Sequence, residues 1–558
     1  MKRESIQKVI ALALSAVMAW GFVACGTPSN GSSSKESTSL SSEAFSSSSE
    51  EQGSSLKGSS SSSGSGPFFS SSSSEDSSES STIDSSMASS SDSSEDSSEF
   101  SSSSSGDSSS GSDVIEPQGA VPYDGSAVEV TFYHAMGANL RSVLDKYISK
   151  FNKLYPNITI RHTTMGDYDS VRDRIATELT GGNSPSMAYC YPEHVVLYNE
   201  VGAALTLEDY ISSTDVITMA NGNTEIVGYT QAQLDDFIAP FYAEGKVYGD
   251  DKTYTLPFPK STEILYYNKT FFEEYNLTVP ATWDEMETVC EQIKTIDKYC
   301  IPFVYDNEPN WFITMTQQLG TPYASATADN PFLFNTPENR AFVERFTDWY
   351  QKGYFTTKEI LGSYGSEIFT ETDSDRIKSY MCIGSSAGAS YQCPPLESSG
   401  YPFEVGVAML PQANPEAPAV IQQGPSLCFF KKSNPQEQAA AWLFAKYLTT
   451  SVEFQAEFSV TSGYTPVIKS ATEHPIYQDF LEKADGNQYL QASVIKQSLA
   501  QVDAYFVPPA FEGSSVARDE VGKLMQICFT RAPKDGAAAF IEQEFKKTVD
   551  TLVYDYGY

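Results

Sequence analysis

A strand, a helix and a second strand follow one another within residues 128–162, and this order constrains the fold more than any other feature. Residues 128–133 alternate apolar and polar side chains, which is typical of a strand. Apolar residues then recur at helical spacing over 140–151, and a second strand follows at 158–162. Such a βαβ unit predicts a parallel α/β sheet. Ligands bind at the carboxyl ends of strands in these sheets, so we expect Tyr133 at the rim of a cleft.

The first 25 residues predict an export signal that ends at a lipid-modified cysteine. Basic residues precede an apolar stretch from Val9 to Val23, which is too short to span a bilayer as a helix. The run FVACG at 22–26 resembles the bacterial lipoprotein box. We therefore expect residues 1–24 to be a lipoprotein signal peptide and Cys25 to anchor the protein to the cell membrane, facing outside. An ordinary secretory signal is the alternative.

Serine dominates the chain from Ser29 to about residue 125. This composition buries too little apolar surface to offset the conformational entropy of folding, so residues 25–126 predict a disordered tether. A flexible chain of this length reaches ~50 Å. Residues 127–558 are too many for one hydrophobic core, and two lobes are expected.

Charge and metal-binding side chains exclude several classes of function. The formal net charge of −36 leaves no basic face for nucleic acid. The cysteines beyond Cys25 show no zinc-binding spacing and the chain has only 4 histidines, so we expect neither a metal nor a cofactor. Local disulfides joining Cys290 to Cys300 or Cys382 to Cys393 are one alternative, and buried free thiols are the other.

Motifs for catalysis are also lacking. The folded part has no GxSxG elbow, HExxH helix, P-loop or dinucleotide fingerprint. The carboxylate pair of a glycosidase has no signature of its own among so many Asp and Glu residues. We therefore expect that the protein is not an enzyme.

Several motifs together resemble a known family. They are LPFPKSTEILYYN at 256–268, PATWDE at 280–285, SYMCIGSSAGAS at 379–390, YPFEVGVAMLPQ at 401–412, VIQQGPSL at 420–427 and TSGYTPV at 461–467. In this order they resemble the solute-binding proteins of ABC importers, in the branch that takes up sugars and glycerol phosphates.

The resemblance implies a type II periplasmic-binding-protein-like fold, with two α/β lobes joined by hinge strands around a ligand cleft. The N-lobe would comprise about 127–262 and 420–465, and the C-lobe about 263–419 and 466–558. The family's partners are ABC permease transmembrane subunits, which recognise the protein closed around its ligand. A ligand-presenting sensor and a polysaccharide-binding surface module are alternative functions.

The same resemblance implies a set of ligand-binding residues, and the residue types suggest others. Carried over by motif, the family's binding positions fall at Tyr168, Ser261, Ser385 or Ser386, Gly424 and Tyr464, and its acidic contact falls at Pro192 or Glu193. Tyr133, Trp311 and Phe511 are aromatic side chains that can stack on the C–H faces of a sugar.

The substrate class depends on an arginine near the C-terminus. Where glycerol-phosphate-binding members of the family carry a phosphate-binding arginine, this chain has Ala510 and Phe511, and Arg518 follows in what we predict to be the next helix. An arginine fork is the usual partner of a phosphate group. We therefore expect a neutral mono- or oligosaccharide or a polyol, with glycerol-3-phosphate or a glycerophosphodiester as the alternative.

Overall fold

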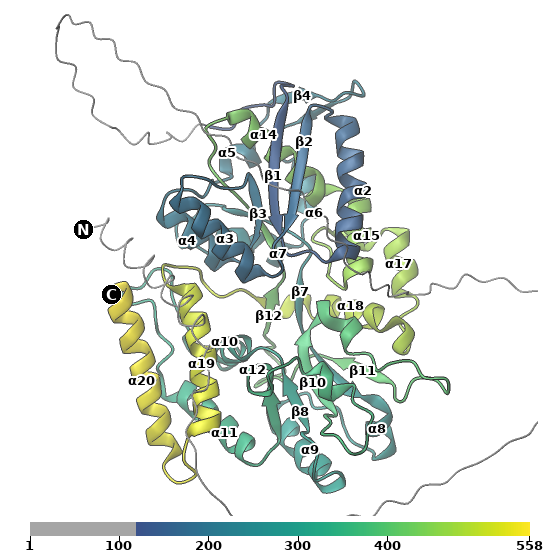
Figure 1. Ribbon diagram of the computed structural model, residues 1–558, viewed down its shortest axis with the longest axis vertical. Helices are drawn as coiled ribbons and strands as arrows, with labels where there is room; N and C mark the ends of the chain where they lie inside the picture. The colour runs from purple at the N-terminus through teal and green to yellow at the C-terminus, as the bar shows by residue number, and fades with distance from the viewer. Residues whose placement is uncertain (1–118) are drawn as a thin grey trace, which may run out of the picture. The chain divides into compact units, whose positions relative to one another are not determined.

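The computed structural model describes residues 119–558, which lie within one compact unit. Two α/β lobes are present (Figure 1), one around β1 (Val128–His134) and the other around β7 (Ser261–Asn268). We call them the N-lobe and the C-lobe. The predicted signal peptide, Cys25 and most of the predicted tether lie outside the described residues.

The N-lobe is built on a five-stranded sheet. Its strand order is β2 (Ile158–Thr164), β1, β3 (Met187–Cys190), β13 (Ser426–Phe429) and β6 (Thr255–Pro257). β1 pairs in parallel with β2 along its whole length and with β3 on its other side. β13 pairs antiparallel with both β3 and β6, so a segment from late in the chain lies inside this sheet.

The helix between the first two strands is α2 (Ala138–Leu154). Its buried side chains are Val143, Leu144, Tyr147 and Phe151, which belong to the apolar set whose spacing predicts the helix. They pack into the N-lobe core. The predicted βαβ unit is confirmed.

Further helices cover the N-lobe sheet. The longer ones are α3 (Tyr168–Thr180), α4 (Pro192–Glu200), α14 (Pro435–Thr450), α15 (Val452–Ser462) and α17 (Pro475–Leu481). The shorter elements are α5 (Glu208–Ser212), β4 (Val216–Thr218), β5 (Thr224–Ile226), α6 (Gln231–Asp236), α7 (Ala239–Ala243), η1 (Glu244–Lys246) and α16 (Lys469–Thr472).

The C-lobe is built on a mixed sheet with β7 near its centre. The strand order is β14 (Tyr505–Phe506), β12 (Val420–Gln423), β7, β10 (Met381–Ser385), β8 (Phe303–Tyr305) and β9 (Phe355–Thr357), and β11 (Val405–Ala408) pairs with β7. The shorter helices are α8 (Lys269–Glu274), α12 (Lys358–Leu361), α13 (Ser366–Phe369), η2 (Ser386–Tyr391), η3 (Asn487–Tyr489) and η4 (Val502–Ala504).

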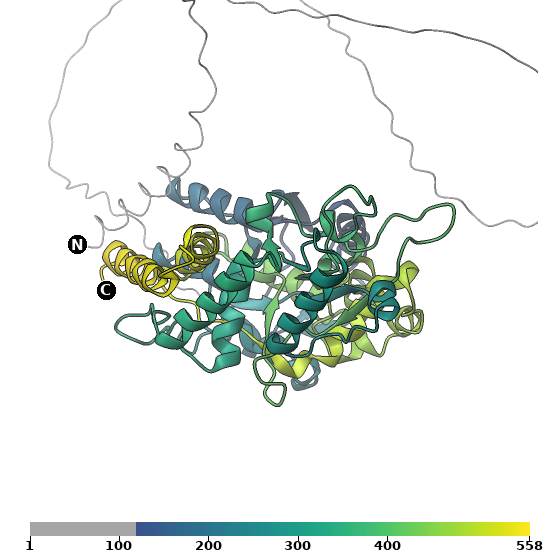
Figure 2. The ribbon, with the colours of Figure 1, turned by 90° about the horizontal axis from the view of Figure 1, so that it is seen from below.

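Long helices complete the C-lobe. They are α9 (Trp283–Ile296), α10 (Glu308–Leu319), α11 (Pro337–Gln351), α18 (Leu490–Ala500), α19 (Ser514–Arg531) and α20 (Ala537–Tyr556). The helices α19 and α20 lie side by side along one flank, as their yellow ribbons show in Figures 1 and 2. α19 also packs on α10 and α11, so the C-terminal part of the chain is integral to the C-lobe core.

The chain passes between the lobes at places that differ from the predicted boundaries. β12 belongs to the C-lobe sheet, so the return to the N-lobe occurs at Gly424 and not at residue 420. The helices α16 and α17 pack on α15, and Tyr477 lies in the N-lobe core. The final passage into the C-lobe therefore follows α17 and does not occur at 466.

The folded part also begins earlier than residue 127. Tyr123 packs edge-on against Tyr155, with ring centroids 6.3 Å apart. The Asp124 amide donates to Gln436 Oε1 at 2.8 Å, and Gln436 Nε2 donates to the Pro122 carbonyl at 3.3 Å. The segment 121–126 is thus part of the N-lobe surface and not of a tether.

Residues 119–558 contain no disulfide. Their seven cysteines are all free and six of them are buried, so the free-thiol alternative holds here. No helix in this range is long and apolar enough to cross a membrane. The same range contains no group of three or more His, Cys, Asp or Glu side chains arranged to hold a metal ion.

Candidate functional site

The two lobes face each other where β3 ends and α4 begins. Tyr191 is the N-cap of α4 and Pro192 is its first residue. This position is the carboxyl edge of the N-lobe sheet, where α/β proteins bind ligands. A cavity of about 20 Å³ remains between the lobes. Its lining residues are Tyr191, Pro192, Glu193, Glu244, Ile421, Gln422, Gln423, Gly424, Val507, Pro508 and Arg518.

Stacked tyrosines form the N-lobe wall beside this cavity. The ring of Tyr168 stacks on those of Tyr191 and Tyr189, with centroid distances of 4.7 and 6.2 Å. The hydroxyl oxygens of Tyr168 and Tyr464 are 3.3 Å apart. Burial, followed by the neighbouring tyrosines, raises the pKa of Tyr168 well above its usual value, so this hydroxyl stays protonated. Sequence reasoning found Tyr168 and Tyr464 but gave no signal for the other two.

The C-lobe wall is a hydrogen-bonded polar network centred on Asn310. Asn310 Oδ1 accepts from Arg518 Nη2 and, at 3.0 Å, from Gln423 Nε2. Asn310 Nδ2 donates to Glu263 Oε1 at 3.0 Å, and the Tyr305 hydroxyl donates to Glu263 Oε2. Burial raises the pKa of Glu263 to about 7, although these donors and Arg518 act in the opposite direction. The network fixes its members before a ligand arrives.

Charged side chains approach each other across the cleft. Arg518 Nε lies 3.8 Å from Glu193 Oε1, and these side chains are only 17% and 14% exposed. Nearby, Arg172 Nη1 of α3 donates to Ser515 Oγ of α19 at 3.5 Å. Burial raises the pKa of Asp519, which Arg172 partly offsets. The lobes therefore meet through polar and charged groups.

The position of Arg518 corrects the expectation that the cleft lacks an arginine. The residue does lie in the helix α19, as predicted, but this helix begins at Ser514 and Arg518 falls within its second turn. The helix packs against α4, so the side chain reaches the cavity. Counting residues along the loop could not reveal this contact.

Comparison with known proteins identifies the family. A model for the bacterial extracellular solute-binding proteins matches residues 146–483. The chain belongs to this family. The sn-glycerol-3-phosphate-binding periplasmic protein UgpB of Escherichia coli K12 is 24% identical over 381 residues, which cover 65% of this chain and 80% of the relative.

Solved structures support the same fold for this solute-binding protein. UgpB of Mycobacterium tuberculosis, in complex with glycerophosphocholine, has a TM-score of 0.59 at 17% identity and covers 77% of this chain and 99% of its own. Maltose-bound MalE3 of T. maritima has a TM-score of 0.57 at 19% identity, with coverage of 77% and 100%. The predicted type II fold is confirmed.

Four other predicted residues carry hydroxyl groups, and they lie on β1, β7, β10 and η2 of the solute-binding protein. Ser386 Oγ accepts from the Thr262 amide at 3.2 Å, and Ser385 Oγ accepts from the Ala387 amide at 3.2 Å. Ser261 is 4% exposed and begins β7. The Tyr133 hydroxyl donates to Glu178 Oε1 of α3 at 3.1 Å. Tyr133, Ser385 and Ser386 do not line the cavity, and no stacking contact joins them to the Tyr191 ring that does, so we leave these three out of the proposed site.

Trp311 lies in the C-lobe core. Its side chain is 0% exposed, and its ring stacks on Tyr305 with centroids 4.7 Å apart and planes 8° apart. It also packs against Phe346 and Phe355. Because a buried indole offers no face to a sugar, Trp311 is likewise left out of the proposed site. An aromatic residue early in a helix has the same sequence signature in a core as in a cleft.

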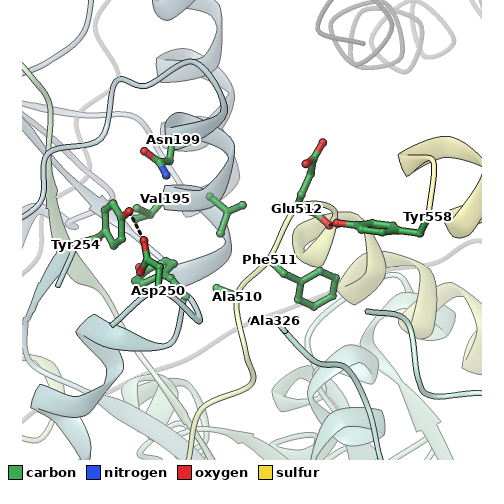
Figure 3. A pocket seen from close by; sticks show the side chains of 11 residues that line it. Val195, Asn199, Asp250, Tyr254, Ala326, Ala510, Phe511, Glu512 and Tyr558 are labelled. Atoms are coloured by element: carbon green, nitrogen blue, oxygen red, sulfur yellow. Dashed lines mark hydrogen bonds between the residues drawn. The ribbon is translucent and has the colours of Figure 1, made fainter. Parts of the chain in front are cut away.

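Phe511 lines a second and larger opening between the lobes, of about 210 Å³ (Figure 3). Val195 and Asn199 of α4 lie on one side, opposite Phe511 and Tyr558. Phe511 is 7% exposed and packs on Phe332, so most of its ring belongs to the C-lobe core. Phe511 is therefore separated from the stacked tyrosines and lies farther along α4.

A buried ion pair supports the hinge. Lys260 Nζ lies 2.6 Å from Glu244 Oε1, and the two side chains are 0% and 3% exposed. Ser426 Oγ accepts from Lys260 Nζ at 2.9 Å and donates to Glu244 Oε1 at 2.7 Å. Gln422 Nε2 donates to the other Glu244 oxygen. The pair thus joins the first crossing between lobes, at Lys260, to the second crossing, around Gly424.

Gly424 has a conformation that other residues rarely adopt. Its φ is +89°, and an added Cβ would lie 2.9 Å from the Ser261 amide nitrogen and 3.0 Å from Lys260 Cα. Both neighbours are backbone atoms, so relieving the clash would require the main chain to shift, which lowers stability. We expect Gly424→Ala to lower the free energy of unfolding by about 1 to 3 kcal/mol. Calorimetric melting measures this loss.

Gly388 provides the matched control for that substitution. It has no atom within 4 Å of an added Cβ and no unusual φ. Gly388→Ala should leave the melting temperature within about 1 °C of the parent, since the change corresponds to only a few tenths of a kcal/mol. Equal melting temperatures for the two variants would contradict the strain assigned to Gly424.

Proposed function

We propose that this protein is the solute-capturing component of an ABC importer and that it binds a neutral sugar or polyol between its lobes. The observation that carries the proposal is the tyrosine stack that ends at Tyr191, which lines the same cavity as Arg518 and Gln423 of the C-lobe. Aromatic faces suit the C–H faces of a sugar, and the amide and guanidinium groups suit its hydroxyl oxygens. The proposed contacts are Tyr168, Tyr191, Glu193, Ser261, Gly424, Tyr464 and Arg518.

The charge of the cleft favours a neutral ligand. Arg518 brings one positive charge, and Glu193 lies against it. Burial raises the pKa of Glu193; Arg518 opposes this rise, and the nearby carboxylates of Glu244 and Asp519 add to it. A phosphate dianion would enter a site that already contains carboxylates, and like charges in a partly buried site repel strongly.

Glycerol-3-phosphate or a glycerophosphodiester is the second candidate, and the presence of Arg518 in the cleft favours it. An arginine can bind a phosphate through two parallel hydrogen bonds. Relatives named for binding sn-glycerol-3-phosphate and a structure named for its complex with glycerophosphocholine are consistent with this candidate. MalE3, named for its maltose complex, is consistent with the first.

Capture would proceed by closure of the lobes. A ligand that contacts both lobes stabilises the closed form by its differential affinity, and the permease subunits recognise that form. Nothing in this cycle requires catalysis. The lipid anchor at Cys25 would keep the protein at the outer surface of the membrane as a monomer, within reach of the permease.

A thermal-shift screen of the full chain tests the proposal. The panel contains neutral mono- and oligosaccharides, polyols, glycerol-3-phosphate and glycerophosphodiesters. A ligand at 100 times its dissociation constant adds ~2.7 kcal/mol of stability, which raises the melting temperature measurably. We expect shifts with neutral saccharides or polyols. Shifts with the phosphorylated compounds alone would overturn the neutral candidate in favour of the second.

A further inference from the structure

Arg518 and Glu193 belong to different lobes and pair only when the lobes are together. Glu193 is in the first turn of α4, and Arg518 is in α19. Their charged groups are 3.8 Å apart, and the side chains are 17% and 14% exposed. At this depth the attraction between opposite charges is stronger than at the surface.

The C-lobe holds the guanidinium in place without neutralising it. Arg518 Nη2 donates to Asn310 Oδ1, whose amide is fixed in turn by Gln423 and Glu263. Asn310 is neutral, so it positions Arg518 but leaves its charge uncompensated. A buried guanidinium needs a counter-ion, because removing a charge from water is costly.

The other carboxylates near Arg518 are engaged elsewhere. Glu244 is paired with Lys260 at 2.6 Å. Burial raises the pKa of Glu263 to about 7, and its oxygens accept from Tyr305 and Asn310. Burial raises the pKa of Asp519, and Arg172 opposes this rise more strongly than Arg518 does. Glu193 is therefore the carboxylate that remains for Arg518.

Little space is left beside this pair. The cavity lined by both side chains has a volume of about 20 Å³, which is enough for a single water molecule. Any ligand therefore needs the lobes to move apart before it can enter, and an anionic group that approaches Arg518 also competes with the Glu193 carboxylate 3.8 Å away.

We propose that Glu193 is a built-in counter-anion of Arg518 and that it determines the charge selectivity of the cleft. A neutral ligand leaves the pair intact, so closure gains both the ligand contacts and the ion pair. An anionic ligand must displace Glu193 and leave that carboxylate without a partner. This inference rests on the proposed function only in taking the interlobe cleft as the binding site.

The variant Glu193→Gln tests this role because it removes the charge and keeps the side-chain size. Glu178→Gln is the matched control, since Glu178 is 16% exposed, pairs with Arg174 at 2.6 Å and lies on α3 of the same lobe. Calorimetric titration of the full chain measures the affinity for two compounds. The anionic probe is sn-glycerol-3-phosphate, and the neutral probe is the neutral compound that gives the largest thermal shift. X-ray scattering of the unliganded proteins measures how open they are.

We expect Glu193→Gln to bind sn-glycerol-3-phosphate at least about tenfold more tightly than the parent, a difference near 1.4 kcal/mol, while the control does not. Its affinity for the neutral compound should change less. The unliganded variant should have a larger radius of gyration, because the lobes lose their ion pair.

Two outcomes overturn the inference. The first is that Glu193→Gln has a ratio of anionic to neutral affinity within about twofold of the parent's ratio, or shows no detectable binding of the anionic probe. The second is that the Glu178→Gln control gains as much affinity for the anionic probe as Glu193→Gln does. If the parent itself binds sn-glycerol-3-phosphate and no neutral compound, the neutral candidate fails. The role of Glu193 is then judged by the variant's change in affinity for that probe alone.

Discussion

Substituting Lys260 with methionine should lower the free energy of unfolding by about 3 to 5 kcal/mol, the largest loss of stability that we expect from a single change. The substitution removes a charge that is 0% exposed and leaves Glu244, 3% exposed, without its partner. A buried carboxylate without a counter-ion must either become protonated or take in water, and both cost stability. Calorimetric melting and denaturant unfolding of the full chain measure the effect.

A double substitution and a surface control separate the ion pair from general damage. In Lys260→Met/Glu244→Gln no charge remains unpaired, and the glutamine oxygen still accepts from Ser426 or Gln422, so part of the stability should return. Lys523→Met removes a lysine that is 61% exposed and pairs with Glu520. It should cost less than about 1 kcal/mol. A double variant no more stable than Lys260→Met would argue against the pair as the source of the effect.

Substituting Arg518 with glutamine should weaken ligand binding roughly 10- to 100-fold, because a hydrogen bond from a charged group contributes about 1.5 to 3 kcal/mol. The change removes the positive charge from the C-lobe wall and leaves Glu193 and Asn310 without that partner. The melting temperature should fall much less than for Lys260→Met, because the site borders a cavity. Calorimetric titration with the compound found in the thermal-shift screen measures the loss.

Arg531 offers a control on the same helix. It is the last residue of α19 and is exposed, so Arg531→Gln should bind as the parent does. Arg518→Lys keeps the charge without the planar fork and should fall between parent and Arg518→Gln. Unchanged affinity in Arg518→Gln would remove this residue from the binding site.

Much of the fold could be predicted because its signals are local. The alternation over 128–133 and the helical spacing over 140–151 are properties of neighbouring residues, and both elements form as expected. The lobe boundaries depended on long-range pairing instead. Whether β12 joins one sheet or the other is decided by its partners β7 and β14, which lie far from it in the chain.

Site residues that belong to a short loop motif could be predicted from the sequence. Site residues that reach the cleft through packing between distant helices could not. Gly424 and Tyr464 come from short loops with characteristic residues, and both lie at or near the cleft. Arg518 reaches the cleft because α19 packs against α4, a contact between segments more than 300 residues apart. Trp311 has no local signal that distinguishes a core position from a cleft position.

The placement of β13 has a consequence for the order in which the protein acquires its structure. β13 is inserted between β3 and β6, although residues 426–429 follow the first strands by more than 200 positions. A growing chain that ends at Asn268 therefore lacks the strand that fills this gap, and the facing edges of β3 and β6 stay unpaired. The N-lobe cannot finish folding until most of the C-lobe sequence has been made, which makes folding slow and leaves the nascent chain unfolded for longer.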